Sequence, residues 1–198
     1  MKVLFVAPEV RLDAAPNHFP FWAGILAAIV EQKGGQVGIL DLNALRDNYN
    51  GHLVPTRKII EEISSEKWDL IGIGGLTTTY ARIKQLTPLI RKHSPDSLFI
   101  GGGGWSTYNP TEILHLIPEL DLIVLGEGEE TFSELYDEVN NGTRDFEKVN
   151  GLCIRDNTDY KFTAPRALIA DLNTVPYPAY DLIETEIGVG MPRAPELL

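Results

Sequence analysis

The sequence predicts an α/β protein built on a doubly wound, five-stranded parallel sheet with helices on both faces. Two patterns support this fold class. Short apolar runs typical of buried strands alternate five times with segments of helical periodicity. Each helical segment is long enough to cross between parallel strands. The five strands are expected over 2–7, 36–42, 69–74, 97–100 and 122–125.

The first elements have clear boundaries. The apolar run Lys2–Ala7 ends at Pro8, which has no backbone N–H to donate to a strand ladder. The segment 19–33 repeats apolar residues at helical spacing and ends at Gly34, a residue suited to the helix C-terminus. The second strand, over 36–42, follows at once.

The middle of the chain continues the alternation. A short helix over 56–66 precedes the third strand, and a helix over 80–93 follows that strand. The fourth strand ends in a run of glycines, after which Pro110 opens another helix near its first position, where proline is tolerated.

The fifth strand and its helix form the segment 121–139, DLIVLGEGEETFSELYDEV. Its apolar run, 122–125, is too short for a helix and rich in branched side chains. Gly126-Glu-Gly128 ends the strand, and helical spacing then begins. Glu129 and Glu130 fall in the first turn, where the helix dipole favours carboxylates.

The alternation ends at about residue 142. The segments 151–155 and 160–163 flank a turn and predict a β-hairpin. Closely spaced prolines in 175–182 then exclude a regular helix or central strand. We therefore expect a Rossmann-like domain over 1–145, followed over 146–198 by a hairpin and an extended connector of a longer protein.

Composition excludes several classes of partner. The chain has 198 residues, a net charge of −11 and a pI of about 4.8, which argues against nucleic acid or an anionic membrane as a partner. The longest apolar run, 21–30, is too short to span a bilayer. The N-terminus does not resemble a signal peptide, and the single Cys153 fits a reducing compartment. These features predict a cytoplasmic protein.

Unusual loops follow the strands at one edge of the sheet. Pro8-Glu9, Gly74-Gly75 with Thr77, Thr78 and Thr79, the glycines 101–104, and Gly126-Glu-Gly128 all fall at carboxyl ends. Parallel α/β sheets bind their ligands at that edge. The sequence therefore places function on this rim.

The glycine run is the most informative of these loops. Four glycines remove every Cβ and allow a flat or bulky ligand to approach the backbone, although a tight turn is the alternative. Neither a G-x-G-x-x-G dinucleotide fingerprint nor a Gly-Lys-Ser/Thr phosphate loop is present. Trp105 and Tyr108 follow the glycines, where they could contact a planar ring or simply pack against a neighbouring loop.

The polar rim residues also have two interpretations. The threonines 77–79 could hydrogen-bond a ligand or cap a helix, and Glu127 and Glu129 could accept ligand hydrogen bonds or be solvated at a helix start. The histidines are scattered without zinc spacing, although His18 could reach the rim. No Ser-His-Asp or Cys-His arrangement is legible.

Four motifs, in order, carry a family resemblance. They are Gly102-Gly103 with Pro110-Thr-Glu, the segment 126–132 (GEGEETF), the segment 149–155 (VNGLCIR) and the segment 171–182 (DLNTVPYPAYDL). Together they resemble the N-terminal cobalamin-binding domain of cobalamin-dependent radical S-adenosylmethionine (SAM) enzymes. The resemblance implies a flavodoxin-type fold with cobalamin on the rim.

The resemblance also implies a set of site residues and a form of the cofactor. A D-x-H-x-x-G motif is absent, so cobalamin would have its own base displaced and no protein histidine on cobalt. The C-x-x-x-C-x-x-C motif is missing, and Cys153 alone cannot hold an iron–sulfur cluster. The candidate cofactor-binding residues are Pro8, Glu9, Leu76, Thr77, Thr78, Thr79, Gly102, Gly103, Gly104, Trp105, Tyr108, Gly126, Glu127, Gly128 and Glu129.

On this interpretation the chain is a cobalamin-binding module. The iron–sulfur cluster, SAM and the catalysis, methyl transfer or another radical modification, would belong to a radical SAM barrel absent from this chain. Two alternatives stay open: a cofactor-free docking domain of such a protein, and a nucleotide- or nucleotide-sugar-binding transferase domain. We expect Gly103→Val to weaken cobalamin binding through steric bulk without unfolding the domain.

Overall fold

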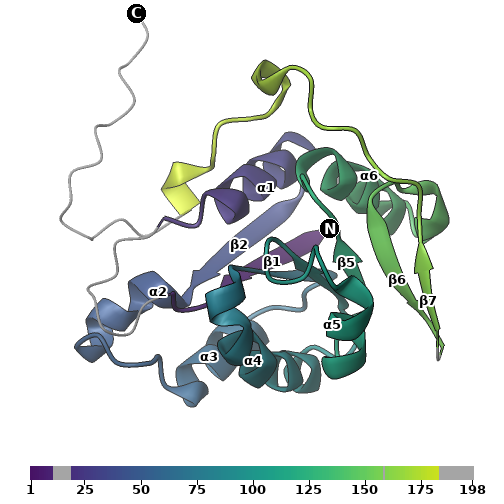
Figure 1. Cartoon of the computed structure of the whole chain (residues 1–198). Coiled ribbons are helices and arrows are strands. Elements are labelled where there is room, and N and C mark those ends of the chain that lie inside the picture. Colours follow the sequence, from purple (N-terminus) through teal and green to yellow (C-terminus); the bar gives the residue numbers. More distant parts are fainter. Residues whose placement is uncertain (11–18, 158, 183–198) are drawn as a thin grey trace, which may run out of the picture.

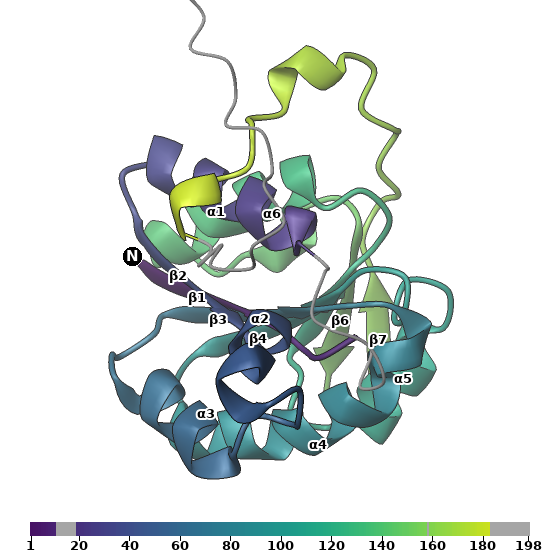
Figure 2. The same ribbon diagram turned by 90° about the vertical axis from the view of Figure 1, so that its left-hand side faces the viewer.

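A sheet of seven strands divides the molecule into two helical layers (Figures 1 and 2). The computed structural model describes residues 1–10, 19–157 and 159–182. The strand order is β2-β1-β3-β4-β5-β6-β7. The strands are β1 (Lys2–Ala7), β2 (Gln36–Asp41), β3 (Leu70–Gly74), β4 (Leu98–Gly102), β5 (Leu122–Val124), β6 (Leu152–Asp156) and β7 (Asp159–Phe162).

The first five strands are parallel, as the sequence predicts, but the expected strand count of five is too low. The hairpin β6–β7 is not separate. It pairs antiparallel with β5, with Leu122 opposite Ile154, and extends the sheet to seven strands. Leu152 and Cys153 are fully buried, so the hairpin gains an apolar surface by joining the sheet.

Helices cover both faces of the sheet, which confirms the doubly wound architecture. The helices α1 (Phe21–Gln32) and α6 (Glu129–Asn140) lie on one face, and α3 (Thr56–Ser64), α4 (Tyr80–His93) and α5 (Pro110–Leu116) lie on the other (Figure 2). A short α2 (Leu42–Leu45) follows β2. Within the described ranges, no helix combines the length and the apolar character needed to cross a bilayer.

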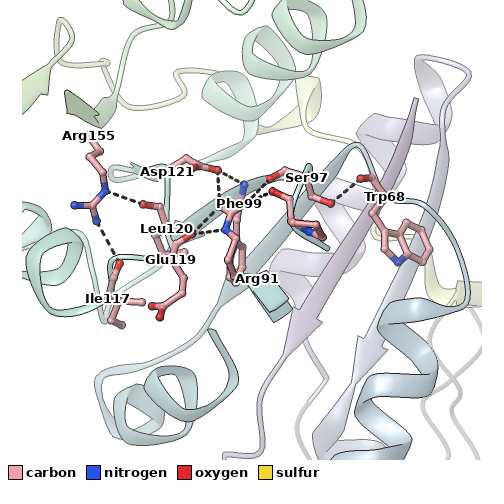
Figure 3. A network of polar contacts seen from close by, with 10 residues as sticks. Trp68, Arg91, Ser97, Phe99, Ile117, Glu119, Leu120, Asp121 and Arg155 are labelled. Atoms are coloured by element: carbon pink, nitrogen blue, oxygen red, sulfur yellow. Dashed lines mark hydrogen bonds and ion pairs between the residues drawn. The ribbon is translucent and has the colours of Figure 1, made fainter. Parts of the chain in front are cut away.

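A polar network fastens the amino-terminal edge of the sheet (Figure 3). The Arg91 guanidinium, at the end of α4, donates to the carbonyls of Ser97 and Glu119 at 2.9 and 2.7 Å and to the Asp121 carboxylate at 2.8 Å. Arg155, on β6, donates to the Leu120 carbonyl at 3.2 Å and to carbonyls at the end of α5. These backbone carbonyls have no hydrogen-bond donor within the described sheet, and the two arginine side chains supply one.

A connector, residues 164–182, returns from the hairpin across α6 to α1 (Figure 1). The Arg166 guanidinium donates hydrogen bonds to side chains of α6, and the Ala179 amide donates to the Gly24 carbonyl of α1 at 3.0 Å. The Tyr180 ring lies 5.1 Å from that of Phe19. The connector is extended, as expected, apart from two short 3-10 helices.

Candidate functional site

A pocket of about 310 Å³ opens at the carboxyl edge of the sheet, between the strands and the layer of α1 and α6. Its lining comes from β1, β3, β4 and β5, from the loops that follow β3, β4 and β5, and from α1 and α6. Since β1 and β3 are neighbours and the chain order reverses between them, the pocket lies at the topological switch point, where open α/β sheets bind ligands.

Two glycines that line this pocket have open space at their Cβ positions. A Cβ built on Gly104 would have nothing within 4 Å, and one on Gly102 would have only Val124 atoms at 3.7 and 3.9 Å. Neither glycine has a positive φ, so the backbone does not require glycine there. The two positions therefore form a cradle that side chains would fill.

Other glycines in the pocket are required by packing. A Cβ on Gly72 would lie 2.8 Å from the Phe5 ring, and one on Gly74 would lie 2.8 Å from Trp22. Gly103 has a φ of +97°, and its Cβ would lie 2.8 Å from the Gly75 carbonyl oxygen. Gly103→Val would thus distort two loops rather than only add bulk, and it is a poor probe of ligand contact.

Aromatic side chains form an apolar part of the pocket wall. Phe5, Trp22 and Phe132 all line the pocket. The Phe5 ring meets that of Trp22 edge-on at 5.9 Å and that of Phe132 at 5.3 Å. None of the three was among the site residues predicted from the sequence. Phe5 and Gly72 are paired across β1 and β3, so both face the same side of the sheet, and this register is not visible in the sequence.

The two glutamates of the Glu127 loop, Gly126 to Gly128 with Glu129 after it, have different environments. One oxygen of the exposed Glu127 carboxylate accepts a hydrogen bond from the Ile169 amide of the connector at 2.7 Å. The Oε2 atom of Glu129 is buried and has no hydrogen-bond partner among the described residues. Glu129, which lines the pocket, therefore carries a buried acceptor that is costly to leave without a donor.

The structure brings about half of the sequence-predicted residues to the pocket. The predicted residues that line it are Leu76, Gly102, Gly103, Gly104, Gly126, Glu127, Gly128 and Glu129. The others do not line it, for reasons that differ from residue to residue.

Trp105 and Thr79 make contacts within the fold. Trp105 is buried in the core on the opposite face of the sheet, and its indole N–H donates to the Gly102 carbonyl at 2.8 Å. The Thr79 hydroxyl donates to the Leu76 carbonyl at 2.7 Å, while Thr77 and Thr78 are exposed. Tyr108 is 85% exposed and lies outside the pocket lining.

Pro8 and Glu9 are buried at the end of β1 and do not line the pocket. The Glu9 carboxylate, only 1% exposed, pairs with the Arg82 guanidinium at 2.8 and 3.0 Å and accepts from the Val54 amide at 3.4 Å. Both of its oxygens are engaged, so Glu9 ties β1 to α4 and to the segment before α3.

A second buried carboxylate, that of Asp41, lies near Glu9. It caps α2 by accepting from the amides of Asn43 and Ala44 at 2.9 and 3.1 Å. Arg46 belongs to the same buried cluster and donates to the Asn43 side chain at 3.4 Å. Burial raises the pKa of Asp41 from 3.8 to about 6; the two amides lower it, and the Glu9 charge raises it further.

We expect Asp41→Asn to stabilise the protein above pH 6. Because the folded pKa exceeds the unfolded value, this group contributes stability that is present at low pH and is lost as the pH rises from about 4 to 6. Asparagine retains the capping oxygen without the buried charge. The unfolding free energy from urea titrations should rise by roughly 2 kcal/mol at pH 8 and little at pH 4. An equal gain at both pH values would contradict this explanation.

Among the described residues, no group of three His, Cys, Asp or Glu side chains could hold a metal ion. Cys153 is buried, and burial raises the pKa of its thiol to about 11, so it is an unreactive core residue. His18, which the sequence analysis placed within reach of the rim, lies outside the described residues.

The chain is similar to proteins of known family. The family model described as the B12 binding domain matches residues 10–136. An uncharacterised methyltransferase of Pyrococcus horikoshii is 30% identical over 187 residues, which are 92% of this chain and 39% of that protein. The chain thus spans about two fifths of the length of this relative.

Solved structures share the fold. The radical SAM methyltransferase TsrM from Kitasatospora setae, with cobalamin and a [4Fe–4S] cluster bound, has a TM-score of 0.70 at 22% identity, over 89% of this chain and 31% of TsrM. The cobalamin-dependent radical SAM enzyme OxsB, with aqua-cobalamin and SAM bound, has a TM-score of 0.75 at 20% identity, over 91% and 24%. With the family match to more than half of its residues, this chain belongs to the B12-binding domain family.

Proposed function

We propose that the chain binds cobalamin in the glycine-lined pocket and serves as the cofactor module of a radical SAM protein. The observation that carries the proposal is the cradle at Gly102 and Gly104, at the switch point of a B12-binding domain. Residues 1–145 would supply the cofactor-binding domain, and the hairpin and connector would lead towards a radical SAM barrel.

The residues present fit this cofactor. A corrin is broad, and its amide fringe supplies N–H donors. The cradle offers room beside the backbone, and Glu129 offers a buried acceptor without a partner in the described residues. Phe5, Trp22 and Phe132 give the pocket an apolar wall that excludes water. Bound cobalamin would supply a cobalt centre able to carry a methyl group or change its oxidation state.

The state of the cobalt ligands is a further part of the proposal. No histidine lines the pocket in the part of the chain that the structure describes, which supports binding without a protein histidine on cobalt. The family resemblance implies that the cofactor's own base is displaced. The iron–sulfur cluster, SAM and the catalytic step would belong to the barrel. A reducing cytoplasm would suit such a protein.

The transferase alternative has little support at this pocket. A basic side chain on the rim would favour binding of a nucleotide phosphate, but none lines the described pocket. The nearby Arg82 is engaged with Glu9. Arg11 lies outside the described residues. The other alternative, a docking domain that binds no cofactor, is tested by titration with the cofactor.

Titration with hydroxocobalamin tests the proposal. The protein, mixed anaerobically with the cofactor and then desalted, should retain about one equivalent, with an absorption spectrum of the displaced-base form. A folded protein that retains no pigment would contradict binding by this chain alone. Repeating the titration on a protein extended through a radical SAM barrel would then separate a shared pocket, which retains pigment, from a docking domain, which does not.

A further inference from the structure

The Glu127 loop contacts two parts of the molecule. It lines the pocket, and it joins β5 to α6. It also meets the connector, where the Ile169 amide donates to Glu127 Oε2 at 2.7 Å across 42 residues of sequence. A carboxylate expected to face the cofactor is thus held by the segment that leaves the domain.

Arg166 fastens the connector three residues before this contact. Its side chain is only 13% exposed. Nε donates to the Thr131 hydroxyl at 2.9 Å, Nη1 donates to Glu130 Oε2 at 3.0 Å, and Nη2 is bonded to Glu134. All three acceptors lie in the first turns of α6, directly after the Glu127 loop. A planar guanidinium presents its donors in a fixed fork, so these bonds fix its direction as well as its position.

A tight junction holds the start of the connector to the other end of the loop. The Gly151 amide donates to the Ala164 carbonyl at 2.8 Å, and the Gly151 carbonyl accepts from the Leu125 amide at 2.8 Å. The Thr131 hydroxyl donates to the Asn150 carbonyl at 3.1 Å. Gly151 has a φ of +81°, and a Cβ there would lie 2.8 Å from that hydroxyl oxygen. The connector therefore contacts the loop at Glu127, holds the first turns of α6 and reaches Leu125, just before the loop, through Gly151.

We propose that Arg166 is a positioning residue for the cofactor, acting through Ile169 and the Glu127 loop. The inference rests on the proposed cobalamin site. A loop that is already ordered loses less conformational entropy when the ligand binds, so the contact raises affinity without touching the cofactor. Because binding couplings are reciprocal, bound cofactor would also hold the connector in place.

Affinity measurements on two pairs of variants test the proposal. Arg166→Met should weaken hydroxocobalamin binding about 10-fold, within the usual range for coupled sites. Lys148→Ala, which removes a surface ion pair whose lysine is 74% exposed, should change affinity less than about twofold. Ile169→Pro removes the amide donor and should match Arg166→Met, whereas Ile169→Ala keeps the donor and should have the smaller effect.

A double variant separates positioning from general stabilisation. If Arg166 acts through the Glu127 loop, Arg166→Met should add less than about twofold to the loss caused by Glu127→Ala. If the affinity losses of the two single variants multiply in the double variant, the assignment is wrong. It is also wrong if Arg166→Met changes the thermal midpoint but leaves the affinity unchanged. Arg166→Lys, which keeps the charge without the fork, should give an intermediate affinity and guards against a methionine variant that fails to fold.

Hydrogen exchange tests the connector without any cofactor. In the free protein, amides 126–130 should exchange about 10-fold faster in Arg166→Met and Ile169→Pro than in the parent or in Ile169→Ala. If the parent protein retains no cobalamin, the proposed function is wrong. The exchange rates of amides 126–130 still decide, in that case, whether the connector orders the loop. Unchanged exchange in both variants would overturn the inference, whatever the affinity.

Discussion

Gly104→Val should weaken cobalamin binding by up to about 100-fold while leaving the folded protein intact. The new side chain would enter space where a Cβ meets nothing within 4 Å, so the cofactor-free protein has no clash to relieve. With cofactor bound, the same atoms would overlap it. Overpacking costs about 1–3 kcal/mol, and the upper end corresponds to a loss of affinity of about 100-fold.

Matched variants make this experiment decisive. Gly104→Ala should give a smaller loss, because one methyl group fills less of the cradle. Asn109→Val places the same side chain at an exposed position in the same loop that does not line the pocket, and it should retain full affinity. The unfolding free energy of all three should stay within about 0.5 kcal/mol of the parent. Full binding by Gly104→Val would move the cofactor site away from this cradle.

The alternation of strands and helices could be predicted because it leaves a strong signal. Parallel strands buried on both faces are continuous apolar runs, and the helix over 80–93 has the expected bounds. The end of β4 was harder to place. Gly101 and Gly102 suggest a loop, yet they continue the ladder opposite Ile73 and Gly74. Glycine weakens a strand by propensity, and the neighbouring strands override that preference here.

The edge of the sheet that carries the pocket could be predicted, but the face of the sheet on which each side chain lies could not. The glycine loop and the Glu127 loop were both expected at the site, and both line the pocket. Trp105 follows the same glycines but turns into the core under α4 and α5. Sequence order gives no information on which face a side chain takes after a glycine run, because each glycine leaves the direction of the chain open.

Long-range polar contacts were also beyond sequence reasoning. Glu9 is adjacent to the rim in sequence, but its partner Arg82 comes from α4, 73 residues away. The Glu127 contact with Ile169 spans 42 residues and depends on the path of the connector. Such pairs carry no local periodicity, so only the folded arrangement identifies them.

Arg91→Met should have the opposite effect to Gly104→Val: a large loss of stability with cobalamin affinity unchanged. The substitution removes the guanidinium that donates to the carbonyls of Ser97 and Glu119, at 2.9 and 2.7 Å, and leaves both carbonyls without this donor. It also removes the contact with Asp121 at 2.8 Å, which itself holds the Phe99 amide at 2.7 Å. Each hydrogen bond to a charged group contributes about 1.5–3 kcal/mol.

The expected loss is about 3 kcal/mol rather than the sum of these contacts, because Arg91 is 24% and Asp121 is 43% exposed and water replaces part of what is removed. Denaturant titration should show it as a lower midpoint with an unchanged m-value. Lys92→Met, at the next and more exposed position, should change the unfolding free energy by less than about 0.5 kcal/mol.

Affinity is the second measurement on Arg91→Met. The network lies at the amino-terminal edge of the sheet and the pocket at the carboxyl edge, so folded Arg91→Met protein should bind hydroxocobalamin within about twofold of the parent. A large loss of affinity in folded protein would mean that the two edges are coupled through the strands. Unchanged affinity beside a lowered denaturation midpoint would show that one edge of this sheet provides stability while the other, with its glycines, is left open for the ligand.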